Sequence, residues 1–220
     1  MKKNNLRKSC KDVFNAFLVE NSSYAGELEM PKLKKTDYIP NELITFSKCK
    51  SSKDINKWVA FFEDDWLFER LWRNPNKYLE VLKSFNGVIL PDFSLYRDMP
   101  LVMQYWNIYR SRAIGVWLQK NGVKIIPNIR FGDERTFNAC CLGIERGGTI
   151  AIGTYGSMKD REDREIMLQG IKYVVKELVP SNLVIFGSLP KELREELQNQ
   201  GINIIIFTSD FAKSRKAVKS

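Results

Sequence analysis

The 220-residue sequence contains no histidine. This absence excludes Ser–His and Cys–His nucleophilic catalysis, zinc sites with histidine ligands, and acid–base work by an imidazole. An enzyme of this composition would have to use carboxylates, arginine, lysine, tyrosine, serine or cysteine. The composition therefore restricts the available chemistry before any motif is considered.

Cysteine pairs of the metal-binding or redox type are also lacking. The sequence has four cysteines, none of them in a C-x-x-C pair: Cys10, Cys49, Cys140 and Cys141. Adjacent cysteines have poor geometry for a disulfide, and no secretion signal precedes them, so reduced thiols are expected. No uninterrupted apolar stretch approaches the roughly 20 residues that span a bilayer. These absences predict a cytoplasmic protein with no membrane partner and leave its oligomeric state open.

Positive charge is present in excess. Lysine and arginine total 35 against 26 acidic residues, which gives a net charge of +9, and much of the excess lies in residues 1–57 and 209–220. Basic ends attract phosphate backbones, but they also serve plain solubility. The chain is predicted to consist of a basic N-terminal segment (1–57) packed on the core, an α/β core domain (58–208), and a basic tail (209–220).

From residue 58 onward, short apolar runs alternate with segments of helical period. The six runs lie at residues 58–62, 87–90, 124–129, 149–154, 183–186 and 202–207. They are continuously apolar, which is typical of parallel strands covered on both faces. The pattern predicts an α/β fold with a mostly parallel sheet of about six strands and crossover helices. An open doubly wound sheet is favoured over an irregular barrel, and the N-terminal segment is expected to be irregular or helical.

Several side chains fall at positions that suggest a structural role. The five tryptophans, at positions 58, 66, 72, 106 and 117, have the spacing of core residues. Cys140 and Cys141 lie in an apolar stretch and are expected to be buried and unreactive. Arg110 and Arg112 alternate with apolar positions on a long helix, which indicates a solvated face.

The segments that follow the strands are polar or small, and they would lie along one edge of the sheet, where α/β folds bind ligands. After the second run comes PDFSLYRDMP, residues 91–100. Asp92 is a candidate acid–base or ligand-orienting carboxylate, Arg97 a candidate anion ligand, and Ser94 and Tyr96 accompany them as binding residues. The alternative is structural: Asp98 caps the next helix, and Asp92 pairs with Arg97 to fix the loop.

A second polar cluster follows the third run. Arg130 and Arg135 flank two acids, so that Asp133 or Glu134 could serve as a general base while an arginine holds phosphate. The alternative is that Asp133 caps the following turn and that the charges neutralise each other.

Glycine and serine follow the last strands in two places. Gly156–Ser157 and Gly187–Ser188 each stand between a strand and a helix, where backbone N–H groups could cradle an anion. Neither matches a P-loop or a dinucleotide fingerprint, and short βα turns need glycine in any case. No motif has metal-ligand spacing. The acidic run 63–65 could bind Mg²⁺ beside Asp92 or Asp133 if the strand order brings them close, although helix capping is the simpler explanation.

The motifs together carry a family resemblance. PDFSLYRDMP, QYWNIYRSRAIGVWLQ (104–119), IPNIRFGDERTF (126–137) and AIGTYGS (151–157), in this order, resemble the DUF4417 family, which occurs on phages, plasmids and other mobile elements of Gram-positive bacteria. The resemblance covers roughly residues 58–207. It implies a mobile-element origin and brings no catalytic residue or cofactor with it.

These observations favour a protein that binds or processes a phosphorylated or nucleotide-like anion at the carboxyl edge of the strands. If it is an enzyme, it would be a hydrolase or group transferase with Asp92, Asp133 or Glu134 as acid or base and arginines on the anion. Two alternatives remain: a nucleic-acid-binding accessory protein of a mobile element, and a non-catalytic inhibitor or adaptor that acts on a host protein.

Overall fold

The structure, a computed structural model, describes residues 12–158 and 160–208. Cys10, the first eleven residues of the basic N-terminal segment and the basic tail at 209–220 lie outside the described residues. No helix in the described part of the chain is both long enough and apolar enough to cross a membrane.

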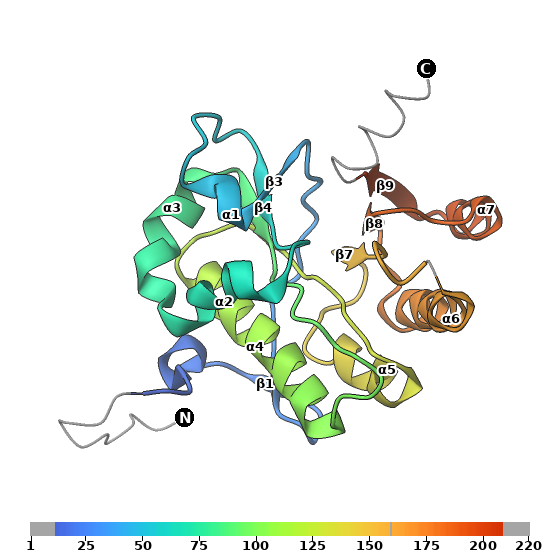
Figure 1. Ribbon diagram of the computed structural model, residues 1–220, viewed down its shortest axis with the longest axis horizontal. Coiled ribbons are helices and arrows are strands. Elements are labelled where there is room, and N and C mark those ends of the chain that lie inside the picture. The colour runs from blue at the N-terminus through green and yellow to red at the C-terminus, as the bar shows by residue number, and fades with distance from the viewer. Residues whose placement is uncertain (1–11, 159, 209–220) are drawn as a thin grey trace.

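The fold consists of short strands joined by helices (Figure 1). The strands are β1 (Tyr24–Ala25), β2 (Met30–Pro31), β3 (Leu43–Thr45), β4 (Trp58–Ala60), β5 (Gly87–Ile89), β6 (Ile125–Ile126), β7 (Thr149–Gly153), β8 (Asn182–Phe186) and β9 (Asn203–Phe207). The α-helices are α1 (Phe46–Cys49), α2 (Asp65–Arg73), α3 (Leu79–Ser84), α4 (Leu101–Lys120), α5 (Glu134–Cys141), α6 (Arg161–Leu178) and α7 (Lys191–Asn199). Two 3₁₀ helices, η1 (Ala16–Val19) and η2 (Pro75–Tyr78), complete the list.

The parallel strands form two sheets in strict chain order. One sheet has the order β3-β4-β5-β6 and the other β7-β8-β9, and every pairing within them is parallel. A single parallel bridge between Asn128 and Ala151 links the two sheets, with hydrogen bonds from Ile129 N to Ala151 O and from Ala151 N to Pro127 O, both 2.8 Å. All six predicted strands are present, and the α/β class with parallel strands is confirmed.

The strand order refines the detailed arrangement. A doubly wound sheet, which the sequence favoured, requires a point where the order reverses, and this order runs from β3 to β9 without reversal. Nor is there a closed barrel, because β3 and β9 are not paired with each other in the described chain. The edge of the sheet at which each successive strand is added depends on packing between distant parts of the chain. Short apolar runs in the sequence contain no information about that packing.

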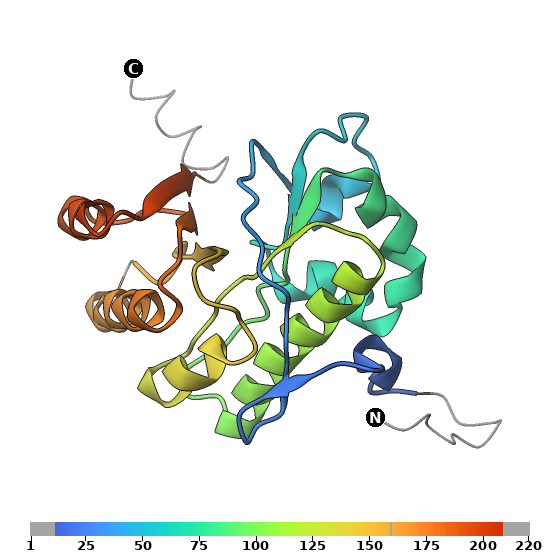
Figure 2. The ribbon, with the colours of Figure 1, turned by 180° about the vertical axis from the view of Figure 1, so that it is seen from behind.

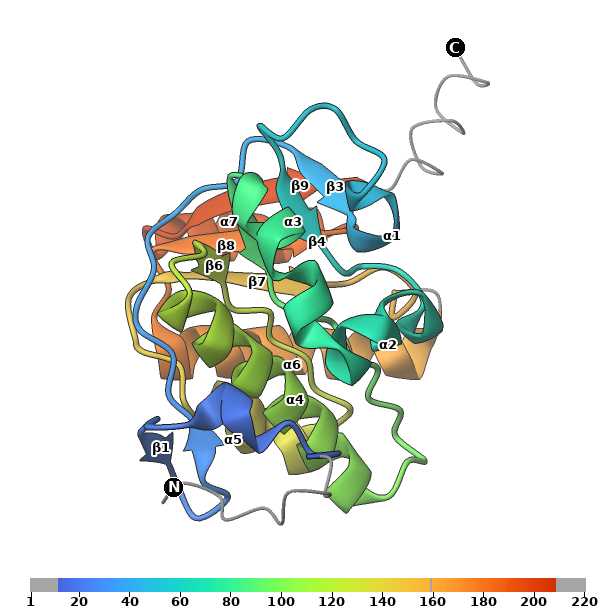
Figure 3. The ribbon, with the colours of Figure 1, turned by 90° about the vertical axis from the view of Figure 1, so that its left-hand side faces the viewer.

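The two linked sheets together form one curved layer of strands. Because the strands follow chain order, right-handed crossovers place all the connecting helices on the outer face of this layer. In Figure 1, helices α1–α4 lie on one side of the molecule and α6 and α7 on the opposite side, with the strands between them. Figure 3 shows α2, α3 and α4 in front of the strands of the first sheet, and a cluster of buried apolar side chains fills the space between them. A second cluster fills the space between β7–β9 and α5–α7.

The inner face of the curved sheet packs on itself. Its buried core comes from β4 to β8 and consists of Trp58, Ala60, Ile89, Ile126, Ala151 and Val184. At the carboxyl end of the strands, Phe62 stacks on Phe186 with ring centroids 4.6 Å apart. Each strand is therefore apolar on both faces: one packs on helices and the other on opposite strands, which explains the continuous apolar runs in the sequence.

The sheet also recruits part of the N-terminal segment. The β1–β2 hairpin lies near α4, and the connection that follows it runs along the molecule to β3, as Figure 2 shows. On the way, Leu33 N donates to Gly143 O at 2.8 Å and Thr149 N to Thr36 O at 2.6 Å. β3 pairs with β4, so the parallel sheet begins before residue 58.

Three burial predictions met different outcomes. Trp58, Trp72 and Trp117 are buried, but Trp66 is 74% exposed and Trp106 is 37% exposed, so the core assignment of these two was wrong. Helical spacing alone does not say which turn of a helix has a neighbour, and both residues lie in the first half of their helix. Cys140 and Cys141 are buried as expected.

The predicted solvated face at Arg110 and Arg112 was also wrong, because both arginines are buried. Arg110 pairs with Glu69 at 2.8 Å and lies over the ring of Phe93. Arg112 donates to the carbonyl oxygens of Asn128 (3.2 Å) and Cys140 (2.5 Å), and burial lowers its pKa to about 10. The two guanidinium groups thus connect α4 to α2 and α5. Apolar side chains at these positions would leave the Glu69 carboxylate and the buried carbonyl oxygens without hydrogen-bond partners.

Candidate functional site

A cavity of about 630 Å³ opens where β5, β6 and β7 end. Its walls come from the loop after β5, the segment after β6, the turn after β7 and one face of α6. Six of the residues predicted from the sequence line it: Ser94, Tyr96, Arg97, Arg130, Gly156 and Ser157. They meet because parallel strands deliver their carboxyl ends to a common edge.

Arg130 is, with Arg97, one of two arginines that line this cavity. Its side chain is 20% exposed, and one guanidinium nitrogen, Nη1, lies 3.9 Å from Asp92 Oδ2 and 3.5 Å from the carbonyl oxygen of Gly153. Its Nε is buried and has no hydrogen-bond partner among the described residues. Both contacts are long for charge-assisted hydrogen bonds, so the guanidinium is only loosely held by these two groups.

Asp92 lies behind Arg130, against the inner face of the sheet. Its side chain is 14% exposed, its Oδ1 accepts a 2.7 Å hydrogen bond from Asn128 Nδ2, and its Oδ2 lies close to the backbone at Gly153. Burial raises the pKa of Asp92, although Arg130 and the hydrogen bond from Asn128 oppose the shift, and the charge of Asp65 adds to it. Asp92 does not line the cavity, so it meets a bound ligand only through Arg130.

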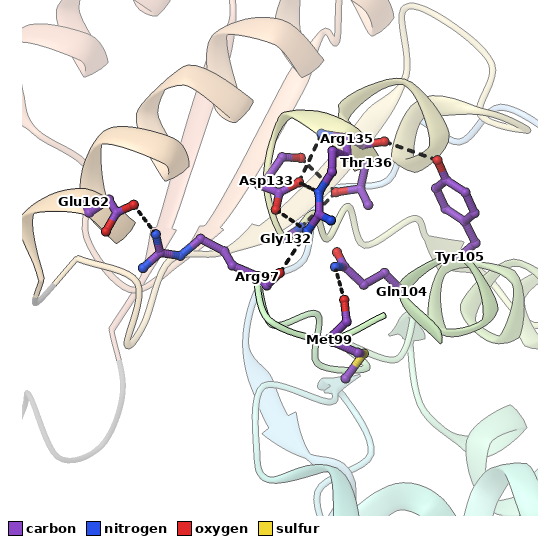
Figure 4. A network of polar contacts seen from close by, with 9 residues as sticks. All are labelled: Arg97, Met99, Gln104, Tyr105, Gly132, Asp133, Arg135, Thr136 and Glu162. Carbon is purple, nitrogen blue, oxygen red and sulfur yellow. Dashed lines mark hydrogen bonds and ion pairs between the residues drawn. The ribbon is translucent and has the colours of Figure 1, made fainter. Parts of the chain in front are cut away.

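The second predicted cluster, around Asp133, forms a closed network (Figure 4). Asp133 caps α5 by accepting from Arg135 N at 3.1 Å, and the Arg135 side chain donates to both of its carboxylate oxygens at 2.9 and 2.7 Å. Arg135 also donates to the carbonyl oxygen of Arg97 at 2.8 Å. These hydrogen bonds from Arg135 lower the pKa of Asp133, which makes it a poor base.

Arg97 connects this network to α6. Its guanidinium pairs with Glu162 (Figure 4). It also pairs with Asp163 at 3.0 Å. The predicted Asp92–Arg97 pair is thus replaced by a bridge between the β5 loop and the first turn of α6. Asp98 does not cap α4, whose N-cap is Pro100 without a side-chain bond, and Glu134 is exposed in the first turn of α5.

The two glycine–serine turns differ in their surroundings. Gly156 and Ser157 line the cavity. Gly187 and Ser188 do not: Ser188 N donates to Thr154 Oγ1 at 3.0 Å, and that hydroxyl donates to Ser188 O at 2.8 Å. The backbone N–H and C=O of Ser188 are therefore both used in hydrogen bonds that connect the end of β8 to the end of β7.

The acidic run after β4 is also occupied by protein contacts. Glu63 accepts from the backbone and hydroxyl of Ser47, at 2.9 and 2.5 Å, and Asp65 accepts from the backbone and hydroxyl of Ser94, at 3.0 and 2.8 Å. Within residues 12–158 and 160–208, no group of three or more acidic or cysteine side chains is placed to hold a metal ion.

Sequence reasoning missed the wall that α6 contributes. Asp163, Ile166 and Met167 line the cavity from one face of this helix. Their spacing of three and four residues does place them on one face, but such spacing is the general signal of a core-facing stripe. Asn128 was missed as well, because it lies within an apolar strand pattern that gives no hint of its contact with Asp92.

Comparison with known proteins identifies the family. Residues 22–208 match the model described as "Domain of unknown function (DUF4417)". The chain belongs to the DUF4417 family. This confirms the resemblance seen in its motifs, and the match starts before β3, so it includes the whole parallel sheet.

Two phage proteins are related to this chain. It is 33% identical over 181 residues to the Gene 1 protein of Mycobacterium phage L5, which covers 81% of this chain and 78% of that protein. It is 32% identical over 181 residues to the Gene 1 protein of Mycobacterium phage D29, with 81% of this chain and 66% of that protein covered. The expected link to phages is therefore confirmed for the family.

Proposed function

We propose that the cavity binds a small phosphorylated or nucleotide-like anion, with Arg130 as its principal anchor. The observation that carries the proposal is the state of Arg130. Its buried Nε has no hydrogen-bond partner among the described residues, and its ion pair with Asp92 is 3.9 Å long. The Arg130 side chain is 20% exposed, and its contacts with the protein are long, so a ligand anion that accepts from the guanidinium gains affinity.

The size and lining of the cavity support this class of ligand. A volume of about 630 Å³ lies within the range of sites for small molecules and cofactors. Tyr96 and Tyr155, 58% and 55% exposed, supply aromatic surface at the lining, on which a base could stack. The lining also contains Asp98 and Asp163, whose carboxylates can accept from the hydroxyl or amino groups of a larger ligand.

Turnover of the ligand would depend on a narrow set of groups. Asp133 is bound by Arg135 and has a lowered pKa, and Glu134 is exposed outside the cavity lining. Asp92 is the one of the three predicted acid–base residues whose carboxylate faces Arg130, at 3.9 Å. Binding is therefore the primary proposal, and hydrolysis or group transfer is an extension that incubation with a bound ligand and product analysis would test.

The experiment is a thermal-shift screen with nucleoside mono-, di- and triphosphates and sugar phosphates. A ligand at one hundred times its Kd adds about 2.7 kcal/mol to the free energy of unfolding. For a chain of this size, that corresponds to a rise in Tm of roughly 5–10 °C. Mass spectrometry of small molecules that co-purify with the protein would direct the choice of ligands.

The decisive variant is Arg130→Gln, which removes the charge and the guanidinium fork. We expect it to fold and to lose the ligand-induced rise in Tm. The matched control is Arg194→Gln, the same change on the exposed surface of α7, which should respond as the wild type does. If no compound raises the Tm, or if Arg130→Gln responds like the wild type, the proposal fails.

The two alternatives, nucleic-acid binding and action on a host protein, remain predictions. The most basic parts of the ends, on which the nucleic-acid alternative depends, lie outside the described residues.

A further inference from the structure

The position of Arg130 has a consequence for how the cavity responds to pH. Arg130 has two sources of negative charge within reach: an anion in the cavity that it lines, and the Asp92 carboxylate, whose Oδ2 lies 3.9 Å from Arg130 Nη1. Its contact with Asp92 is long, and its Nε has no partner in the described chain. The guanidinium can therefore interact either with the Asp92 carboxylate or with an anion that binds in the cavity.

Asp92 depends on Arg130 for its ionised form. Two charged side chains act on it: Arg130, which favours the carboxylate, and Asp65 at the start of α2, which opposes it. Asp65 is held by two hydrogen bonds from Ser94. From β7, the contact is the backbone at Gly153, which has no charge, and Asn128 supplies one neutral hydrogen bond. Anything that weakens the attraction of Arg130 thus favours protonation of Asp92.

We propose that the ligand anion and the ionised Asp92 carboxylate compete for Arg130, so that anion binding is coupled to the uptake of a proton by Asp92. The inference rests on the proposed function, because it requires an anion at Arg130. When the anion binds, it neutralises the guanidinium and adds a like charge near the carboxylate, and Asp92 then takes a proton from solvent. By linkage, a lower pH favours binding: affinity rises by up to about tenfold per pH unit over the range in which Asp92 is ionised in the free protein and protonated in the complex.

Sulfate is the probe for the test, because it keeps its double negative charge through the neutral and mildly acidic range. Any proton exchanged on binding then comes from the protein. Calorimetric titration of the full chain with sulfate, repeated in buffers of different ionisation enthalpy, gives the number of protons taken up. Carbon-13 NMR of the Asp92 carboxyl group, titrated with and without sulfate, shows whether its pKa rises on binding.

Two variants separate this linkage from binding itself. Asp92→Asn removes the titrating group and keeps an acceptor for Asn128. We expect sulfate to bind it at least as tightly as the wild type at neutral pH, without proton uptake. Asp37→Asn makes the same change at an exposed side chain that pairs with Lys35, and it should leave both the affinity and the proton uptake unchanged.

The possible outcomes are distinguishable. Proton uptake by the wild type that is lost in Asp92→Asn supports the coupling. Sulfate binding with no proton uptake, or with the same uptake in Asp92→Asn, overturns the coupling and leaves the anion site intact. If sulfate does not bind the wild type at any pH, the anion site at Arg130 and the coupling both fail.

Discussion

Arg130, in the segment after β6, and Arg135, in the first turn of α5, are only five residues apart but have opposite surroundings. Arg135 donates three side-chain hydrogen bonds at 2.7–2.9 Å, two of them to Asp133. Arg130 makes two contacts of 3.5 and 3.9 Å and has a buried Nε without a partner in the described chain. The first arginine completes a structural network, while the second retains donor capacity beside a cavity.

The two glycine–serine turns show the same contrast. Gly187–Ser188 is closed on β7 through Thr154, whereas Gly156–Ser157 lines the cavity. A polar residue at a strand end is therefore not a site by position alone. What matters is whether the protein itself satisfies the polar group, because a satisfied group has little to gain from a ligand.

The largest effect on the free energy of unfolding should come from Gly187→Ala, in the turn that is hydrogen-bonded to Thr154. Gly187 has φ +128°, and a Cβ there would lie 2.5 Å from Thr154 Oγ1 and 2.9 Å from Tyr155 N. Backbone strain and the clash together should lower the free energy of unfolding by about 2–4 kcal/mol. Denaturant titration measures this loss.

Gly156→Ala is the matched change on the open side. Its φ is +95°, and a Cβ would meet nothing within 4 Å, so the loss should be about 1 kcal/mol. Equal losses at Gly156 and Gly187 would remove the distinction between the two turns.

Asp133→Ala should have the next largest effect. It removes the cap of α5 and the partner of Arg135, and we expect a loss of about 1–2 kcal/mol at pH 7. Asp133→Asn keeps an N-cap acceptor and should lose less.

The effect of Asp133→Ala should also depend on pH. Because the folded pKa is depressed, the contribution of the carboxylate is present above its unfolded pKa of about 3.9 and is lost as the pH falls through the folded pKa. The difference in free energy of unfolding between Asp133→Ala and the wild type should thus become smaller as the pH is lowered. A gap that stays constant would mean that the charge of Asp133 contributes nothing.

Asp92→Asn should have the smallest effect, and of opposite sign. Because burial raises the pKa of Asp92, the ionised form is the less stable one in the folded protein. The protonated Asp92 side chain makes its full contribution to the free energy of unfolding below the unfolded pKa of about 3.9. The wild type loses this contribution as the pH rises through the raised folded pKa. The variant does not titrate here, so it should be more stable than the wild type at pH 7 and equal to it near pH 3. Thermal unfolding at both pH values checks this, and a destabilised variant at pH 7 would contradict it.

Local sequence patterns predicted much of the fold. The six continuously apolar runs became β4 to β9, because runs of this kind are stable only when both faces are covered. The strand β3 could not be found in this way, since its residues are only half-buried and it depends on pairing with β4. Trp66 was misplaced because helical spacing does not show where a neighbouring element ends.

The candidate site was predicted in part. Chain order placed the polar segments at strand ends, and topology brought Ser94, Arg97, Arg130 and Ser157 into one cavity. The same reasoning also selected Asp133 and Ser188, which belong to closed networks, because a residue type does not show whether it has a partner.

The sequence by itself determined the alternation of strand and helix, the absence of histidine chemistry and the polar character of the strand ends. These properties depend on composition and short-range periodicity, which are local. Only the tertiary structure decided the sequential strand order, the burial of Arg112 and the difference between Arg130 and Arg135. Each of these depends on contacts between residues far apart in the chain, and it is these contacts that satisfy Arg135 and leave Arg130 facing the cavity.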